Sequence, residues 1–311
     1  MTSTVVDARA DELRAARSPF VLAVVVRAER PTSAKPGDRA IVLPDGSIEG
    51  FVGGSCAEST VRVQSLRQLA AGTSVLLRIT PGGDATRPPG FASDVPGLVV
   101  ADNTCLSGGT IEVFLEAVMP PPLLQVFGDT PIARALVAVG SAAGYDARLS
   151  DGPGPVAGDA LAVVVASHGH GEQEVLTAAV SAGVPYVALV ASPKRGAAVL
   201  AEAGVPAGRV KTPAGLDLGA HTPGDVAVSI LAEVVTARTA PRPAPSPAPP
   251  SLLQIGLGAP ATPEIAVDPV CGMDVVAGPD AISLEHAGRT WYFCAPGCKK
   301  AFAADPARYG A

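Results

Sequence analysis

The proline-rich stretch from Pro241 to Pro263 limits the fold of this chain more than any other feature, because it holds eight prolines among small residues. Proline lacks a backbone N–H and has a fixed φ, so this stretch is incompatible with a helix interior or an inner strand. We therefore predict an extended linker over residues 239–266, whose densest part spans roughly 30 Å in polyproline geometry. The linker separates a large body from a short tail, residues 267–311, and lets the tail swing.

The body divides at the three prolines that begin at Pro120, where helix and strand signals stop. Residues 1–118 mix helices and strands in the order of an α+β domain. Residues 123–238 alternate short apolar strands with helices, which is the pattern of a parallel, Rossmann-like sheet. The final helix follows Thr222, a typical N-cap residue, and starts with a proline. The predicted fold class is α/β, with a small metal-binding module after the linker.

Charge and hydropathy exclude two classes of partner. The formal net charge is −6 with no block of Lys or Arg, whereas binding to nucleic acid requires a basic face. No apolar run approaches the ~18 residues that a membrane span needs. The first 20 residues lack the apolar stretch of a secretory signal, so we expect a cytoplasmic protein. Small molecules and proteins remain as the expected partners.

Three of the five cysteines lie in the tail, at positions 271, 294 and 298. A segment of ~45 residues buries too little surface to be stable without help, and metal ligation is the usual help in a reducing compartment. Cys294 and Cys298 can converge on one ion with Cys271, and sulfur ligands suit Zn(II) or Cu(I). The fourth ligand is open among His286, Asp268, Met273, a water and a partner. The alternative is that reduced cysteines simply pack a small core.

A candidate phosphate loop, Gly128-Asp129-Thr130-Pro131, joins a strand to a helix in the second domain. Gly128 permits a tight turn, and the helix N-terminus offers N–H groups to an anion such as a nucleotide phosphate. Asp151 follows the next strand, where a ribose-binding carboxylate is expected. However, Thr130 replaces the middle glycine of the dinucleotide fingerprint and Asp129 adds negative charge, so the pattern favours a Rossmann-like topology more than NAD binding.

Two histidines spaced by a glycine, His168 and His170, directly follow the apolar strand 160–166. Loops at the carboxyl ends of parallel strands are where such sheets bind ligands. The imidazoles could donate to phosphate, move a proton or ligate a metal. A solvated loop without a ligand is the alternative.

The first domain offers a glycine-cysteine motif, Gly53-Gly54-Ser-Cys56-Ala-Glu58, and a second one with Cys105 and Gly108. Cys56 stands at a predicted helix N-terminus, where the macrodipole lowers the pKa of a thiol. Such a thiol could carry sulfur or contact a metal. The alternative is a buried cysteine that opens a helix.

These motifs together resemble the XdhC/CoxI family over residues 15–240, most specifically from Pro213 to Glu233. The tail, with its Asp-Pro-Val-Cys-Gly-Met start and Tyr-Phe-Cys-x-x-x-Cys end, resembles the YHS family of metal-binding modules. The resemblance implies a maturation factor that binds molybdenum cofactor (molybdopterin) and assists its sulfuration and its insertion into a xanthine dehydrogenase or carbon monoxide dehydrogenase type of hydroxylase. The implied partners are the apo-molybdenum hydroxylase, a cysteine desulfurase and a second copy of the chain.

The motifs and the resemblance together indicate three sets of residues. Cys56, Glu58 and His168 are the catalytic candidates. The cofactor-binding candidates are Gly53, Gly54, Cys105, Gly108, Gly128, Asp129, Thr130, Pro131, His168, His170, Ser192 and Asp217. The metal-binding candidates in the tail are Cys271, Cys294, Cys298 and His286, with zinc or copper as the ion. Where family members often carry Gly-Ser-Arg, this chain has Ala-Ser-Pro-Lys-Arg from residue 191, so that part of the resemblance is weaker.

Two other functions remain open at this stage. The Rossmann-like half could serve an NAD(P)-dependent oxidoreductase, although no catalytic Tyr-Lys set is evident. The tail could make the chain a metal carrier or sensor, with the body as a scaffold that senses a ligand. The motifs favour a cofactor-binding chaperone over a conventional enzyme.

Overall fold

A computed structural model of the chain describes residues 3–81, 96–103, 109–150, 152–206, 208–239, 264–278 and 281–309. The contacts divide it into two compact units, one of residues 1–120 with 255–311 and one of residues 121–254. The prolines of the predicted linker and Asp151 lie outside the described residues. Each unit is described by itself.

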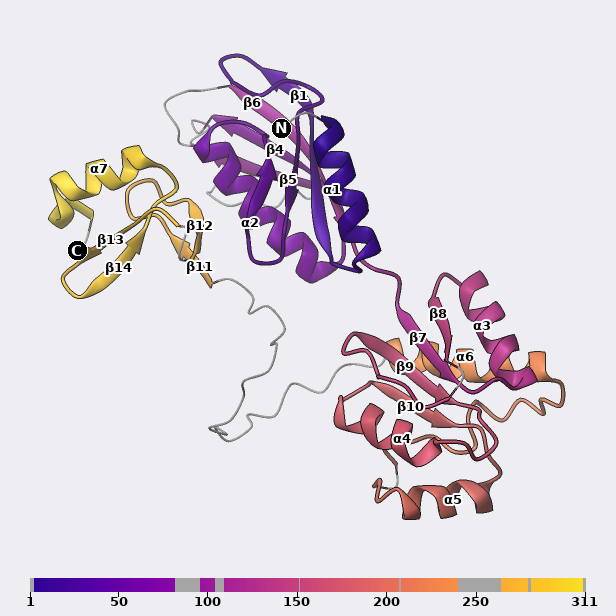
Figure 1. Cartoon of the computed structure of the whole chain (residues 1–311). Helices are drawn as coiled ribbons and strands as arrows, with labels where there is room; N and C mark the ends of the chain where they lie inside the picture. Colours follow the sequence, from indigo (N-terminus) through magenta and orange to yellow (C-terminus); the bar gives the residue numbers. More distant parts are fainter. Residues whose placement is uncertain are drawn as a thin grey trace. The chain divides into compact units, whose positions relative to one another are not determined.

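The first unit contains a six-stranded mixed sheet in the order β3-β2-β1-β6-β4-β5 (Figure 1). Strands β4 and β5 are parallel, and the other neighbours are antiparallel. The elements are α1 (Ser3–Ala15), β1 (Phe20–Glu29), β2 (Arg39–Val42), β3 (Ile48–Gly50), α2 (Ser55–Ala71), β4 (Val75–Pro81), β5 (Leu98–Asn103) and β6 (Thr110–Val118). The predicted α+β domain is confirmed.

Helices α1 and α2 cover opposite faces of this sheet because side chains alternate along β1. Phe20 and Leu22 pack with α1, whereas Val21 and Ala23 pack in the core that contains Ala57 of α2. One side of α2 therefore packs on the sheet, and its other side can contact another segment.

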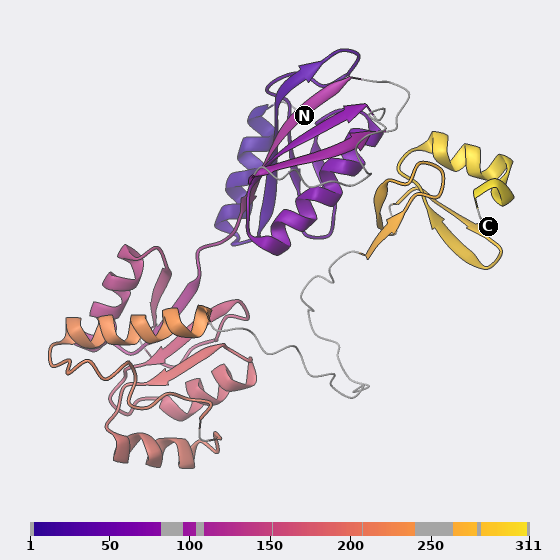
Figure 2. The same ribbon diagram turned by 180° about the vertical axis from the view of Figure 1, so that it is seen from behind.

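The second unit is a four-stranded parallel sheet in the order β10-β9-β7-β8. Figure 1 shows α4 and α5 on one face, and Figure 2 shows α3 and α6 on the other. The elements are β7 (Leu123–Phe127), α3 (Pro131–Ala142), β8 (Asp146–Ser150), β9 (Ala160–Val165), α4 (Glu172–Ser181), β10 (Tyr186–Leu189), α5 (Pro193–Glu202) and α6 (Pro223–Thr239). The prediction of a Rossmann-like parallel sheet is confirmed.

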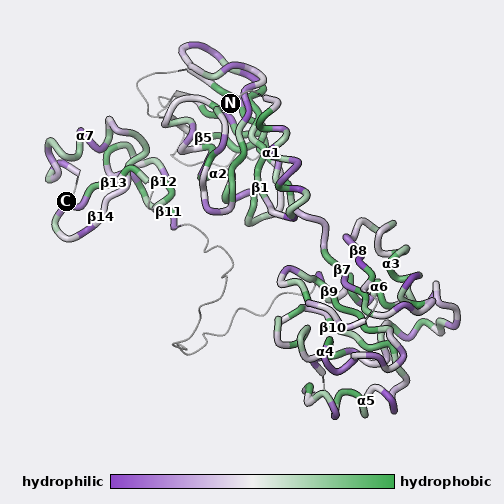
Figure 3. Tube along the Cα trace, viewed as in Figure 1, coloured by the Kyte–Doolittle hydropathy of each residue, from purple (hydrophilic) through white to green (hydrophobic). Residues whose placement is uncertain are grey.

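Both faces of this sheet are buried, so its central strands β7 and β9 are apolar except for Gln125 (Figure 3). Along β7, Leu123 and Phe127 join the core under α4 and α5, whereas Leu124 and Val126 join the core under α3 and α6. Two separate cores thus fix the strand ends, where loops leave the sheet.

Helix caps explain two boundaries of the second unit. At the start of α6, Asp225 N donates to Thr222 Oγ1 at 3.2 Å, as the N-cap prediction requires. Helix α5 was not predicted from the sequence. It begins like α6, with Ser192 Oγ accepting from Arg195 N at 3.4 Å and a proline at its first position.

The tail forms two antiparallel hairpins and a short helix. Its elements are β11 (Glu264–Val267), β12 (Asp274–Ala277), β13 (Ser283–His286), β14 (Arg289–Tyr292), α7 (Pro296–Ala304) and the 3-10 turn η1 (Pro306–Tyr309). Fully buried Phe302 is its centre, with the rings of Trp291 and Phe293 at 5.1 and 5.3 Å between centroids. In the described part of the chain, every helix is too short or too polar to cross a bilayer.

Candidate functional site

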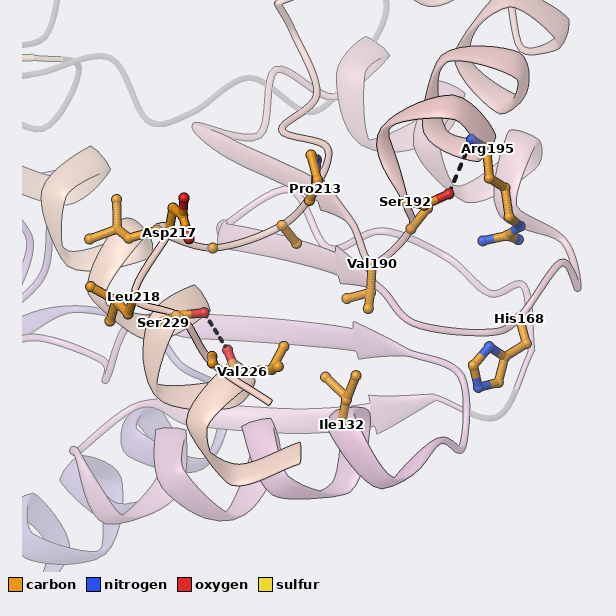
Figure 4. A pocket seen from close by; sticks show the side chains of 15 residues that line it. Ile132, His168, Val190, Ser192, Arg195, Pro213, Asp217, Leu218, Val226 and Ser229 are labelled. Atoms are coloured by element: carbon orange, nitrogen blue, oxygen red, sulfur yellow. Dashed lines mark hydrogen bonds between the residues drawn. The ribbon is translucent and has the colours of Figure 1, made fainter. Parts of the chain in front are cut away.

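The parallel sheet of the second unit ends in a pocket of about 830 Å³. Its lining comes from the loops after β9 and β10 and from the first turns of α3 and α5, which is where open α/β sheets bind ligands. Figure 4 shows His168, Ser192 and Arg195 at one end of this pocket and Asp217 at the other. Three of the sequence-predicted residues thus share one cavity.

A buried carboxylate, Glu172, holds the polar end of the pocket together. It is 1% exposed, and its Oε1 accepts from Gly169 N at 2.9 Å while its Oε2 accepts from Arg195 Nη2 at 2.6 Å. The ion pair fixes the guanidinium beside His168, whose backbone is in the left-handed region at φ 54°. Glu172 was not among the predicted site residues, since an acidic residue in a first helical turn commonly serves only the helix dipole.

The two predicted histidines lie in different surroundings. His168 lines the pocket, whereas His170 is exposed and its Nδ1 lies 3.0 Å from the carbonyl oxygen of Ser167 in its own loop. The loop therefore presents one imidazole to a ligand in the pocket, and the other stabilises the loop itself.

Packing, helix capping and an ion pair within the protein explain the residues of the predicted phosphate loop. A side chain at Gly128 would collide with the backbone carbonyl of Ala166, so close strand packing alone requires glycine there. Thr130 is the N-cap of α3, and its Oγ1 accepts from Ala133 N at 3.2 Å. Asp129 pairs with Arg134 and its pKa is lowered by that hydrogen bond. None of these three residues, nor Pro131, lines the pocket at its described boundary, although Ile132 does.

The other wall of the pocket is the loop from Pro213 to Asp217, anchored by Glu233 of α6. The Glu233 carboxylate accepts from Gly215 N at 2.9 Å and from the Tyr186 hydroxyl at 2.8 Å. Burial and this carboxylate raise the pKa of Tyr186, so the phenol stays a donor. Glu233, the last residue of the motif that begins at Pro213, is therefore hydrogen-bonded to Gly215 near the motif's start, and this bond holds one wall of the pocket.

The tail gathers three thiols and a carboxylate into a compact cluster of Asp268, Cys271, Cys294 and Cys298, with ligand atoms within 4.8 Å of one another. Cys294 Sγ lies 3.4 Å from Cys271 Sγ and 3.7 Å from Cys298 Sγ. Tetrahedral binding at Zn–S of about 2.3 Å separates two sulfurs by about 3.8 Å. The donor set and its spacing therefore fit a thiophilic metal ion.

Asp268 positions the loops that carry these thiols. The side chain is fully buried, and its two oxygens accept from Val270 N at 2.9 Å and from Cys294 N at 2.8 Å. One carboxylate thereby ties the turn before Cys271 to the strand end at Cys294. Such hydrogen bonds to a binding loop orient metal ligands before the ion arrives.

The close packing of the three thiols and the Asp268 carboxylate changes the pKa values of the thiols. A hydrogen bond with Cys271 and a second one with Cys56 raise the pKa of Cys294. Burial, followed by the charge of Asp268, raises the pKa of Cys298 to about 12. A bound cation would offset both effects, because it favours the thiolate form.

The remaining predicted residues lie elsewhere. His286 is not part of the thiol cluster, because its ring packs edge-on against Phe302 at 6.0 Å between centroids. Cys56 is half-buried in the first turn of α2, after Gly53 and the N-cap Gly54. Glu58 pairs with Arg62 at 2.8 Å. Cys105 and Gly108 lie outside the described residues.

Comparison with protein families gives three matches. The XdhC and CoxI family model matches residues 13–80, the XdhC Rossmann domain matches residues 124–234, and the YHS domain matches residues 266–311. The first matched segment covers β1 to β4 and α2 of the first sheet, the second covers the parallel sheet with the pocket, and the third covers the tail with the thiol cluster.

Two individual proteins are similar to the chain. The uncharacterized protein YqeB of Escherichia coli K12 is 24% identical over 310 residues, which cover 90% of this chain and 53% of that protein. The chain thus spans about half the length of this curated relative. A crystal structure of a xanthine dehydrogenase from Bacillus halodurans is 16% identical and has a TM-score of 0.37, with 79% of this chain and 98% of that chain covered.

Proposed function

Because the chain belongs to the XdhC and CoxI family and ends in a YHS domain, we propose that it is an accessory protein that holds molybdenum cofactor during maturation of a molybdenum hydroxylase. The observation that carries the proposal is the pocket of the second unit, with its fixed cation, imidazole and carboxylate. In this role the chain binds the cofactor, assists its sulfuration and passes it to the apo-hydroxylase.

The pocket suits a ligand with an anionic end and a heterocycle. Arg195 and the first turn of α5 offer a guanidinium and backbone N–H groups for a phosphate. Asp217, at the opposite end, offers acceptors for the N–H groups of a pterin or purine ring (Figure 4). Val190 and Ile132 supply an apolar floor between the two ends. Pterin phosphates and their nucleotides have this combination of groups.

His168 and Cys56 supply the reactive groups in this proposal. The exposed imidazole of His168 can donate to the cofactor or move a proton beside it. Cys56 is a thiol in the first turn of a helix, and it suits either a sulfur atom or a metal ion.

The tail binds a thiophilic metal ion in this account. Cys271, Cys294 and Cys298 would hold the ion, and Asp268 positions two of them or adds an oxygen ligand. The bound ion supplies a positive charge that keeps the thiolates deprotonated and closes the two hairpins onto α7. Zinc and copper both fit the sulfur-rich donor set.

The function is tested by complementing a strain that lacks this protein and measuring molybdenum hydroxylase activity in its extracts. We expect full activity with the wild-type chain and at least a tenfold loss with Arg195→Ala, because a charge-assisted contact worth about 1.5–3 kcal/mol is removed. Arg148→Ala is the matched control, since Arg148 is an exposed arginine on β8 that pairs with Asp146. Arg195→Lys should restore part of the activity.

Normal hydroxylase activity and normal molybdenum content in the strain without the protein would refute the proposed function. Equal losses with Arg195→Ala and Arg148→Ala would refute the pocket as the binding site. The amount of soluble chain in each strain is measured by immunoblot, so that a folding defect is recognised.

A further inference from the structure

Helix α2 contacts the sheet with one side and the tail with the other. Ala57 and Val61 face the sheet core, whereas Val63 and Leu66 form a separate apolar cluster with Val276 of β12. The tail is thus packed against the helix that begins with the glycine-cysteine motif, within one compact unit.

An ion pair extends this contact along the helix. Arg67 Nη2 lies 2.6 Å from the Asp274 carboxylate at the start of β12. Cys56 precedes Val63 by two helical turns, so it lies on the same side of α2 as the residues that contact the tail. The contact therefore runs from the end of the helix back to its first turn.

At that first turn, Cys56 meets the thiol cluster of the tail. Its side chain hydrogen bonds with Cys294, which belongs to the candidate metal site. A cavity of about 190 Å³ adjoins this point and is lined by Ser55 and Glu58 of α2 together with Phe293 and Cys294 of the tail. A fourth thiol is thus available from outside the tail.

The tail alone offers three thiols, and its carboxylate is already engaged. Both oxygens of Asp268 accept backbone N–H groups, one from Val270 and one from Cys294. A thiophilic ion that prefers four tetrahedral ligands gains more from a further thiolate than from an oxygen committed to the loops. The hydrogen bond with Cys294 brings Cys56 to one member of the cluster. Cys56 itself lies outside the group whose ligand atoms are all within 4.8 Å of one another, so its side chain must turn toward the ion to complete the set.

We propose that the metal ion of the tail is bound across the contact with α2, with Cys56 as the fourth sulfur ligand beside Cys271, Cys294 and Cys298. The proposal rests on the metal-binding role of the tail given above. Binding transfers the thiol protons to solvent and leaves the oxidation state of the ion and the sulfurs unchanged. The glycine-cysteine motif of the body and the metal of the tail then form one centre.

The test is a titration of the full-length, reduced protein with Co²⁺, followed by the sulfur-to-cobalt charge-transfer absorption and by X-ray absorption. We expect one Co²⁺ with four sulfur ligands in the wild type. Cys56→Ser should still bind one Co²⁺, with three sulfurs and an absorption lower by about one quarter, since one sulfur of four is lost. Ser55→Ala, a change at the adjacent position of the same helical turn, should match the wild type.

The outcomes separate this inference from the function on which it rests. Four sulfurs in Cys56→Ser, or three in both proteins, would overturn the role of Cys56 and leave the tail as a metal site. A wild-type chain that binds no stoichiometric Co²⁺ would overturn both. As an independent readout, bound Co²⁺ should protect Cys56 from alkylation, and equal labelling of Cys56 with and without the ion would contradict the proposal.

Discussion

The pocket of the second unit and the thiol cluster of the tail are built on opposite principles. The pocket lies at the end of a sheet that is buried on both faces between two apolar cores, so its side chains are attached to a body that is stable without them. The thiol cluster is itself much of the core of the tail, where Cys294 packs with Met273 and Val275. In the pocket, fold and site are separable. In the tail, the side chains that form the site also form much of the core.

This difference predicts how the fold of each region responds when its ligand is removed. Removing a cofactor from the pocket should leave the parallel sheet intact, because its cohesion comes from apolar burial. Removing a metal from the tail should remove the fold as well, because ~45 residues bury too little apolar surface to compensate.

Chelation of the metal should unfold the tail and leave the rest of the chain folded. The loss is expected to be at least several kcal/mol, as for other small metal-dependent modules. Trp291 is the only tryptophan of the chain and packs against Phe302, so its fluorescence reports on the tail alone. Far-UV circular dichroism reports mainly on the helices, of which α1 to α6 lie outside the tail. A Trp291 emission spectrum that is unchanged after verified metal removal would show that the tail folds by itself.

Glu172→Ala should destabilise the second unit by about 2–3 kcal/mol. The variant leaves the Arg195 guanidinium without its partner, and the cost is lower than for a fully buried pair because Arg195 reaches solvent. Glu172→Gln keeps the acceptor for Gly169 N and should lose less. Hydrogen exchange of the β7 and β9 amides measures the opening free energy of this unit. Equal exchange in all three proteins would mean that Glu172 does not hold the pocket.

Asp268→Asn should weaken metal binding by about 10–100-fold, as is usual for groups that orient metal ligands. An amide retains one acceptor, but its NH₂ group cannot accept from the second of the two N–H groups of Val270 and Cys294. Competition with a chromophoric chelator measures the affinity. An unchanged affinity would show that the backbone positions the thiols without the carboxylate.

The smallest effect is expected for the ion pair between Arg67 and Asp274. Both side chains are partly exposed, so each reversal, Arg67→Asp or Asp274→Arg, should cost below about 1 kcal/mol. The double reversal should restore the pair. Thermal unfolding of the metal-bound tail, followed by the fluorescence of Trp291, measures each cost. A large effect of one reversal that the other does not relieve would point to a different role for that residue.

Much of the fold could be predicted because local signals agree with it. The apolar strands of the second unit, the N-cap at Thr222 and the three tail cysteines each carry a short-range pattern. Helix α5 has the same kind of signal, Ser192 followed by a proline, and attention to that cap would have found it. The sequence therefore contained the signal for α5, and the prediction missed it.

Other features depend on contacts between distant residues and leave no pattern nearby. Glu172 is recognised as a site residue only once Arg195 is brought to it from 23 positions away. The docking of β12 on α2 joins residues that are 207 positions apart, as the pair of Arg67 and Asp274 shows. A linker rich in proline predicted that the tail could swing, and did not indicate where it would bind.

The most direct test of the account is the amount of pterin that co-purifies with the full chain from cells that make molybdenum cofactor, determined as oxidised fluorescent pterin per chain. We predict that pterin accompanies both the wild type and Cys294→Ser, because pocket and tail are separable. Arg195→Ala should retain at least about tenfold less, owing to the lost charge-assisted contact. Wild-type protein that carries no more pterin than Arg195→Ala would contradict the central claim that this pocket holds the cofactor.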